Sequence, residues 1–121
     1  MRIICVNTGD KFGQWYVDNL KYMIDNYSGL EYDSFEVINE EKHKGVFNKL
    51  QMFDKFRDGV NLYFDLDVCI YGKLPDLKRK NLTVLYAWWR DRYHTSLNSS
   101  IISWTGAVSY THLTLPTTPY V

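Results

Sequence analysis

The stretch Val60-Asn61-Leu62-Tyr63-Phe64-Asp65-Leu66-Asp67 is apolar at nearly every position up to Phe64 and then carries two acids. An apolar run without polar alternation is typical of a central parallel strand that is covered on both faces. We therefore expect a buried strand over residues 60–64, and we expect strand structure to resume after the acids, over residues 68–70. The two carboxylates would then interrupt a buried strand.

Patterned segments on both sides of this strand extend the same architecture. Apolar residues spaced by three and four positions predict helices, and short β-branched or aromatic runs predict further strands. The expected helices cover residues 14–26 and 46–57, and the expected strands cover residues 2–6, 35–38, 82–89 and 99–104. Because strands alternate with helices and crossovers are right-handed, the sequence predicts an α/β fold with a mostly parallel, Rossmann-like sheet flanked by helices.

The composition limits the classes of protein to consider. The 121 residues include 14 Lys and Arg and 14 Asp and Glu, so the net charge is zero and a basic nucleic-acid-binding domain is disfavoured. Apolar residues make up 45% of the chain, which is enough to fill the core of one globular domain. Since the apolar runs are too short for a signal peptide or a transmembrane segment, we expect a cytoplasmic protein. Cys5 and Cys69 lie in apolar runs and are expected to be buried free thiols.

The two acids after residue 64 point to a metal site. Asp65 and Asp67 would project from the same side of an extended chain, roughly 6 to 7 Å apart. Carboxylates beside an apolar strand need compensation, and a hard divalent cation such as Mg²⁺ or Mn²⁺, which could also hold a diphosphate, suits them. The polar residues 7–10 follow the first strand and should face the same crevice. The alternative is a pair of turn or capping acids on a solvated loop, which the apolar flanks and the lack of Gly or Pro disfavour.

Three blocks of the sequence together resemble a known family. They are Phe64-Asp65-Leu66-Asp67-Val68, Asn48-Lys49-Leu50-Gln51-Met52-Phe53 and Leu97-Asn98-Ser99-Ser100-Ile101-Ile102. Over about residues 1–106 the chain resembles the nucleotide-sugar domain of GT-A glycosyltransferases with a DxD motif, and it is most similar to small bacterial and phage-type enzymes. The resemblance implies transfer of a sugar from a UDP- or GDP-sugar to a saccharide or another hydroxyl acceptor, with bound Mn²⁺ or Mg²⁺.

The resemblance also implies roles for single residues on the donor side. Asp67 would be a metal ligand, and Asp65 would reach the metal or the ribose. Asn7 and Thr8 would line the nucleoside pocket. Lys49 would approach the phosphates, although a solvated helix lysine is the alternative for it.

Further polar and aromatic residues are candidates for the sugar or acceptor side. By the same resemblance Asn98 would lie near the donor sugar or the acceptor, the alternative being an ordinary turn residue. Trp88, Trp89 and Trp104 are candidate platforms because aromatic faces pack on sugar faces, and simple core or rim packing is the alternative for them. No catalytic residue is assigned, and the sugar, the acceptor and the stereochemical outcome stay open.

The last part of the chain differs from the rest. All charged residues lie at or before Arg92, and residues 107–121 are rich in Thr and Pro. This segment resembles the translated adaptor sequence found at the ends of reading frames from metagenomic assemblies. We therefore expect a partial domain over residues 1–106, which would be an inactive fragment, and a non-native, disordered tail over residues 107–121. A genuine Thr- and Pro-rich tail is the alternative.

Two other functions stay open. The residues Phe64-Asp65-Leu66-Asp67 also match the motif of haloacid-dehalogenase-type phosphatases, in which Asp65 would attack phosphorus and Asp67 would act as acid and base beside Mg²⁺. That motif usually continues with Gly-Thr and opens the domain, whereas Val68-Cys69 follows here and two strand-helix units precede it. The other alternative is a module that binds nucleotides or carbohydrate without turnover.

Overall fold

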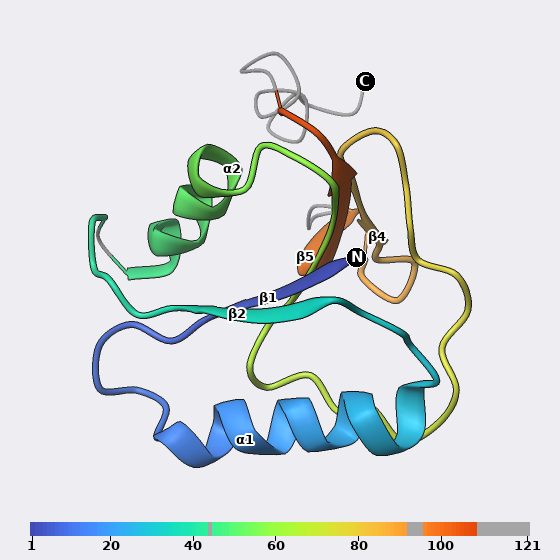
Figure 1. Ribbon diagram of the computed structural model, residues 1–121, viewed down its shortest axis with the longest axis horizontal. Coiled ribbons are helices and arrows are strands. Elements are labelled where there is room, and N and C mark those ends of the chain that lie inside the picture. Colours follow the sequence, from blue (N-terminus) through green and yellow to red (C-terminus); the bar gives the residue numbers. More distant parts are fainter. Residues whose placement is uncertain (44, 92–95, 109–121) are drawn as a thin grey trace.

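Five strands form one mixed sheet in the computed structural model, which describes residues 1–43, 45–91 and 96–108 (Figure 1). The order across the sheet is β2-β1-β3-β5-β4. β1 pairs in parallel with both β2 and β3, whereas β5 runs antiparallel to β3 and to β4. The strands are β1 (Arg2–Val6), β2 (Ser34–Ile38), β3 (Val60–Phe64), β4 (Thr83–Tyr86) and β5 (Leu97–Thr105).

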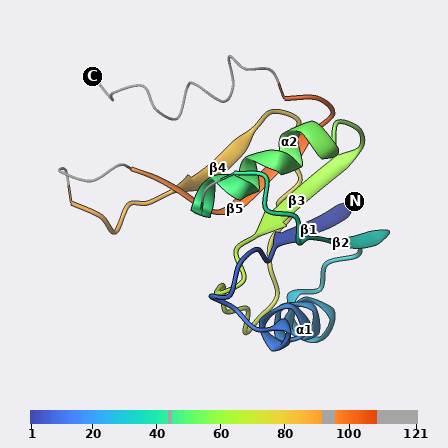
Figure 2. The same ribbon diagram turned by 90° about the vertical axis from the view of Figure 1, so that its left-hand side faces the viewer.

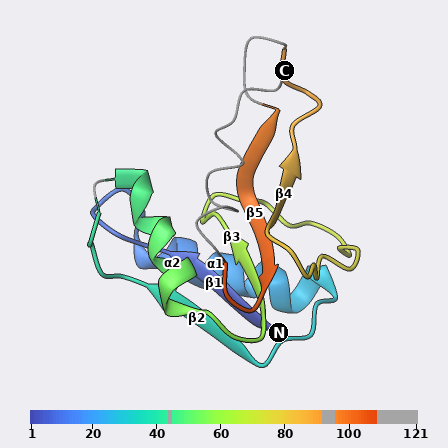
Figure 3. The same cartoon turned by 90° about the horizontal axis from the view of Figure 1, so that it is seen from above.

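The helices cover opposite faces of the sheet, as Figures 1 and 2 show. α1 (Gln14–Met23) continues into a π-helical turn, η1 (Ile24–Ser28), and ends at Gly29, whose φ of 72° is favourable for glycine. On the other face a 3-10 segment, η2 (Gly45–Leu50), leads into α2 (Gln51–Lys55). Figure 3 shows α2 on the β1 and β2 side, with β4 and β5 extending away from it.

Both faces of the central strands are buried, which explains the continuous apolar run of residues 60–64. Leu62 and Phe64 belong to the core cluster that contains residues of α1, together with Ile3 of β1. Tyr63 and Ile4 belong to the cluster that contains residues of α2. Alternate residues of one strand therefore pack against different helices.

The predicted α/β fold with flanking helices is confirmed, but only part of the sheet is parallel. β2, β1 and β3 are linked by helical crossovers and run in one direction. Between β4 and β5 the chain has no room for a helical crossover, so β5 turns back and pairs antiparallel.

Several predicted elements are shorter or different in the structure. Strand structure does not resume at residues 68–70, because the chain turns there and the Val68 N–H donates to the Asp65 carbonyl oxygen at 3.3 Å. Cys69 is consequently exposed, whereas Cys5 is a buried free thiol as predicted. The strand predicted over residues 82–89 is limited to β4, and β5 is longer than predicted.

The second predicted helix is regular only at its end. Asn48 uses its side chain in the preceding loop: its Nδ2 donates to the Gly45 carbonyl oxygen at 2.9 Å, and its Oδ1 accepts from the His43 N–H at 2.8 Å. Such side-chain bonds to the backbone compete with a regular helix. Phe47 and Leu50 are exposed, so the apolar stripe predicted over residues 46–57 is wrong at these two positions.

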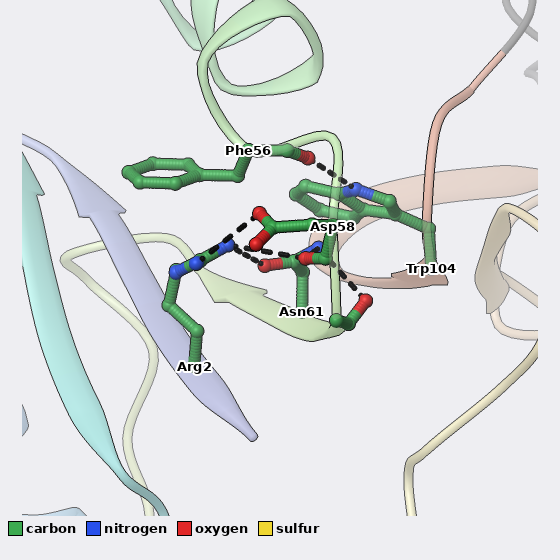
Figure 4. A network of polar contacts seen from close by, with 6 residues as sticks. Arg2, Phe56, Asp58, Asn61 and Trp104 are labelled. Atoms are coloured by element: carbon green, nitrogen blue, oxygen red, sulfur yellow. Dashed lines mark hydrogen bonds and ion pairs between the residues drawn. The ribbon is translucent and has the colours of Figure 1, made fainter.

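A closed polar network holds the amino ends of β1 and β3 (Figure 4). Asn61 Oδ1 accepts from Arg2 Nη1 at 2.8 Å, and Asn61 Nδ2 donates to the carbonyl oxygens of Asp58 and Gly59 at 3.2 and 3.3 Å.

The Trp104 indole N–H donates to the Phe56 carbonyl oxygen at 3.1 Å. Because Trp104 is fully buried, core packing is its role, and it offers no exposed platform for a sugar.

The predicted boundary near residue 106 lies at the end of the described chain. The Gly106 N–H donates to the Gly59 carbonyl oxygen at 3.0 Å, and Val108 packs against the core cluster on the α2 side. Residues 109–121, which form most of the predicted tail, lie outside the described residues.

Candidate functional site

A cleft of about 370 Å³ opens at the carboxyl ends of β1 and β3. Ligands of open α/β sheets gather at this edge, because the loops that follow neighbouring parallel strands diverge there. The lining residues come from the end of β1 and the loop after it, from η2 and the loop before it, and from the end of β3 and the turn after it. They are Val6, Thr8, Gly9, Asp10, Lys11, Phe12, Glu41, Gly45, Asn48, Lys49, Tyr63, Asp65, Leu66 and Asp67.

The two acids of the motif reach this cleft in different ways. Asp65 directly continues β3, and its N–H still donates to the Ser100 carbonyl oxygen of β5 at 2.8 Å. The following turn then carries Asp67 outward, where it is exposed. The expectation that both carboxylates project from the same side of an extended chain is therefore wrong, although both line the cleft.

Lys49 connects the η2 segment with two strands. Its Nζ lies 3.5 Å from Asp65 Oδ1, 2.9 Å from Ser99 Oγ and 3.4 Å from the Ser99 carbonyl oxygen. The Lys49 and Asp65 side chains are only 22% and 28% exposed. Lys49 is thus a half-buried counter-ion of Asp65, and the alternative of a solvated helix lysine is wrong.

Tyr63, which also lines the cleft, contacts the same carboxylate. Its hydroxyl donates to Asp65 Oδ1, and its ring lies 5.4 Å from Lys49 Nζ. Burial first, and then the negative charge of Asp65 and the hydrogen bond to it, raise the pKa of Tyr63 far above its usual value. The hydroxyl therefore stays a donor at ordinary pH. Tyr63 was not predicted, although its position two residues before Asp65 on a strand places both on one face.

The Asp65 side chain has two polar contacts, with Lys49 and Tyr63, and both involve its Oδ1 atom. Among the described residues, no hydrogen bond to Asp65 Oδ2 is present. This carboxylate therefore has one oxygen held by the protein and one available to a ligand in the cleft.

The oxygen chemistry of the cleft fits a hard cation that a ligand helps to hold. No group of three or more His, Cys, Asp or Glu side chains able to hold a metal is present in the described part of the chain. Mg²⁺ commonly uses only one or two carboxylates, with substrate phosphates and water as the other ligands. Asp65 and Asp67 meet this requirement, and Asp10 and Glu41 add negative charge along the same cleft.

The remaining predicted site residues divide between the cleft and other places. Thr8 lines the cleft, whereas Asn7 is not among its lining residues, and the Asn7 N–H donates to the Ile38 carbonyl oxygen at 2.8 Å. Asn98 Oδ1 accepts from the Ser100 N–H at 2.9 Å within β5. Trp88 and Trp89 lie in the turn after β4, 75% and 54% exposed, and do not line the cleft.

Comparisons with known proteins add no relative. No protein-family model matches the chain, and neither the curated proteins nor the solved structures contain a match to it. Across residues 1–43, 45–91 and 96–108, none of the helices has the length and apolar character needed to cross a membrane.

Proposed function

We propose that the cleft binds a nucleotide-diphosphate sugar and that the chain derives from a metal-dependent glycosyltransferase. The observation that carries the proposal is the meeting of Lys49, Asp65 and Ser99 at the edge of the sheet. Each comes from a different one of the three sequence blocks, and Lys49 Nζ contacts both of the others. A volume of about 370 Å³ is in the range of ordinary ligand pockets.

Different residues of the cleft would bind different parts of a UDP- or GDP-sugar. Thr8 and the backbone after β1 would line the nucleoside, and the Lys49 ammonium would pair with the diphosphate. Asp65 and Asp67 would hold Mn²⁺ or Mg²⁺. When bound, the cation would supply positive charge to stabilise the departing diphosphate during sugar transfer to a saccharide or other hydroxyl acceptor. Asn98, Trp88 and Trp89 are not among the residues that line the cleft, and no role in donor binding is proposed for them.

Binding of UDP and GDP, measured by calorimetry with and without Mn²⁺, tests the proposal. We expect binding that requires the cation and that falls by at least about tenfold in Asp67→Asn, or about 1.4 kcal/mol. Asp54→Asn is the matched control, because Asp54 is an exposed aspartate like Asp67 but lies outside the cleft. A folded protein that binds neither nucleotide in the presence of Mn²⁺ would overturn the proposal.

The same preparation separates the two other functions. Turnover of a generic phosphoester that is lost in Asp65→Asn would favour the phosphatase, since that chemistry needs Asp65 as a nucleophile. Cation-dependent nucleotide binding without any sugar transfer would favour a binding module.

A further inference from the structure

Two clusters of the same three residue types, a lysine, an aspartate and a tyrosine, occur in the part of the chain that the structure describes. In the first, Lys21 donates to Asp25 Oδ2 at 2.8 Å and the Tyr32 hydroxyl donates to Asp25 Oδ1 at 2.5 Å. In the second, Lys49 and Tyr63 both contact Oδ1 of Asp65. In each cluster the lysine also lies over the tyrosine ring, at 5.8 Å from Tyr32 and at 5.4 Å from Tyr63.

The two lysines differ in how tightly they hold their aspartates. Lys21 and Tyr32 engage both oxygens of Asp25, and the Lys21 contact is short. Lys49 lies 3.5 Å from Asp65, and its shortest contact is the neutral Ser99 hydroxyl at 2.9 Å. Lys49 therefore neutralises the charge of Asp65 but makes no contact with Asp65 Oδ2. Both side chains are half-buried, and charges interact more strongly there than in water.

An ammonium in this position acts on any cation that approaches the same carboxylate. A divalent ion at Asp65 would be repelled by Lys49, because both charges are positive and the aspartate is shared between them. The anionic oxygens of a diphosphate would give the ammonium a second partner and reduce this repulsion. Binding of the cation and of the diphosphate would then be coupled, and the coupling must be reciprocal.

We propose that Lys49 is a built-in competitor of the divalent cation at Asp65, so that the cation binds tightly only together with a diphosphate. This inference rests on the proposed function of the cleft. It assigns Lys49 a second role besides pairing with phosphate: it keeps the site from filling with metal alone. The lysine thereby makes the site selective for the metal-nucleotide complex over the free cation.

Mn²⁺ binding in the absence of nucleotide, measured from the electron paramagnetic resonance signal of free Mn²⁺, tests this role. We expect Lys49→Met to bind Mn²⁺ alone at least about fivefold more tightly than the unchanged chain, and to bind UDP or GDP with Mn²⁺ at least about fivefold more weakly. Lys21→Met, from the cluster outside the cleft, should change neither affinity. Effects of opposite sign on the two ligands are not expected from a general loss of structure.

Unchanged or weaker Mn²⁺ binding in a folded Lys49→Met variant would overturn the inference. Lys49→Gln provides a second test, because its amide can still bond Ser99 while the charge is absent, and the same gain in Mn²⁺ affinity is expected. If the unchanged chain binds Mn²⁺-nucleotide but neither variant gains affinity for Mn²⁺, only the role of Lys49 fails. If the unchanged chain binds no Mn²⁺-nucleotide, the proposed function itself fails.

Discussion

The two ends of β3 carry polar side chains on the same face but treat them differently. At the amino end, Asn61 is fully buried, and its oxygen and nitrogen are both bonded to neighbouring groups. At the carboxyl end, the Asp65 side chain is 28% exposed and only its Oδ1 has a partner among the described residues. We call the Asn61 end closed, because both polar atoms of its side chain are bonded within the protein. We call the Asp65 end open, because it faces the cleft and only one of its carboxylate oxygens has a described partner.

This difference separates residues that hold the fold from residues that are available for binding. A buried amide with every bond satisfied stabilises the native state, because removing one partner leaves the others unpaired. Asp67, an exposed acid in a cleft with further acids, is expected to stabilise the native state little. Stability and binding should therefore respond to substitutions at opposite ends of the same strand.

The largest expected effect is at the closed end. Asn61→Leu keeps the volume but removes three hydrogen bonds and leaves the Arg2 guanidinium facing an apolar side chain. We expect the free energy of unfolding to fall by about 2 to 3 kcal/mol, measured by denaturant titration. Asn19→Leu on the exposed face of α1 is the control, with an expected change within about 0.5 kcal/mol. Equal changes in the free energy of unfolding of the two variants would mean that the hydrogen bonds of Asn61 in Figure 4 do not contribute to stability.

The next effect in size is expected at Tyr63, which lies between the two ends. Tyr63→Phe removes a buried hydroxyl that donates to a carboxylate, and we expect a loss of about 1 to 2 kcal/mol in the free energy of unfolding. Tyr32→Phe removes the corresponding bond to the exposed Asp25, where solvent screening should keep the loss well under about 1 kcal/mol. A larger loss in Tyr32→Phe would contradict the importance of burial.

The pattern of the sequence predicted the central strands because their burial leaves a direct signal. The apolar run of residues 60–64 and the run of residues 2–6 both became strands with the expected bounds. The first helix was also predicted, since its spacing of apolar residues follows one face. The strands are determined by short apolar runs and the helix by the spacing of its apolar residues, and a single sequence carries both signals.

Contacts between distant segments carry no such signal. The turn after Asp65 has neither Gly nor Pro, so the chain was expected to stay extended there. Lys49 was predicted near phosphate only through the family resemblance, because Ser99 lies 50 positions further along the chain and only the fold brings the two together. The sequence pattern predicts that Tyr63 lies in a buried strand. It cannot predict the polar contact of Tyr63, since a buried tyrosine has the same pattern with or without such a contact.

A smaller effect than that of Tyr63→Phe itself is expected from alkaline pH. Burial raises the pKa of Tyr63 above the ordinary value of 10.0, so above pH 10 the unfolded chain releases this proton while the native state retains it. Stability contributed by the neutral hydroxyl is full below that pH and is lost as pH rises toward the native pKa. The expected loss for this group is about 1 kcal/mol between pH 10 and 11.

Denaturant titrations at pH 8 to 11 measure this loss as a difference between proteins. Tyr63→Phe should lose less stability over this interval than the unchanged chain, and Tyr71→Phe, at an 89% exposed residue, should behave like the unchanged chain. Burial also raises the pKa of the Cys5 thiol to about 12, and this contribution has the same sign in all three proteins. Parallel curves for Tyr63→Phe and the unchanged chain would show that the Tyr63 proton does not contribute.

The smallest effect on stability is expected at the open end, where the effect on nucleotide binding is largest. Asp67 is exposed in a turn that asparagine also accepts. It shares the cleft with Asp10, Glu41 and the Lys49-Asp65 pair as well as with Lys11, so acids outnumber lysines there. Asp67→Asn should therefore leave the free energy of unfolding within about 0.5 kcal/mol of its original value, or raise it slightly at low salt. Asp58→Asn at the closed end removes an exposed partner of Arg2 and should lower stability by a similarly small amount, so the two changes differ in sign rather than in size. If Asp67→Asn instead lowers stability by more than about 1 kcal/mol, Asp67 holds the turn, and the contrast between a closed and an open end of β3 is lost.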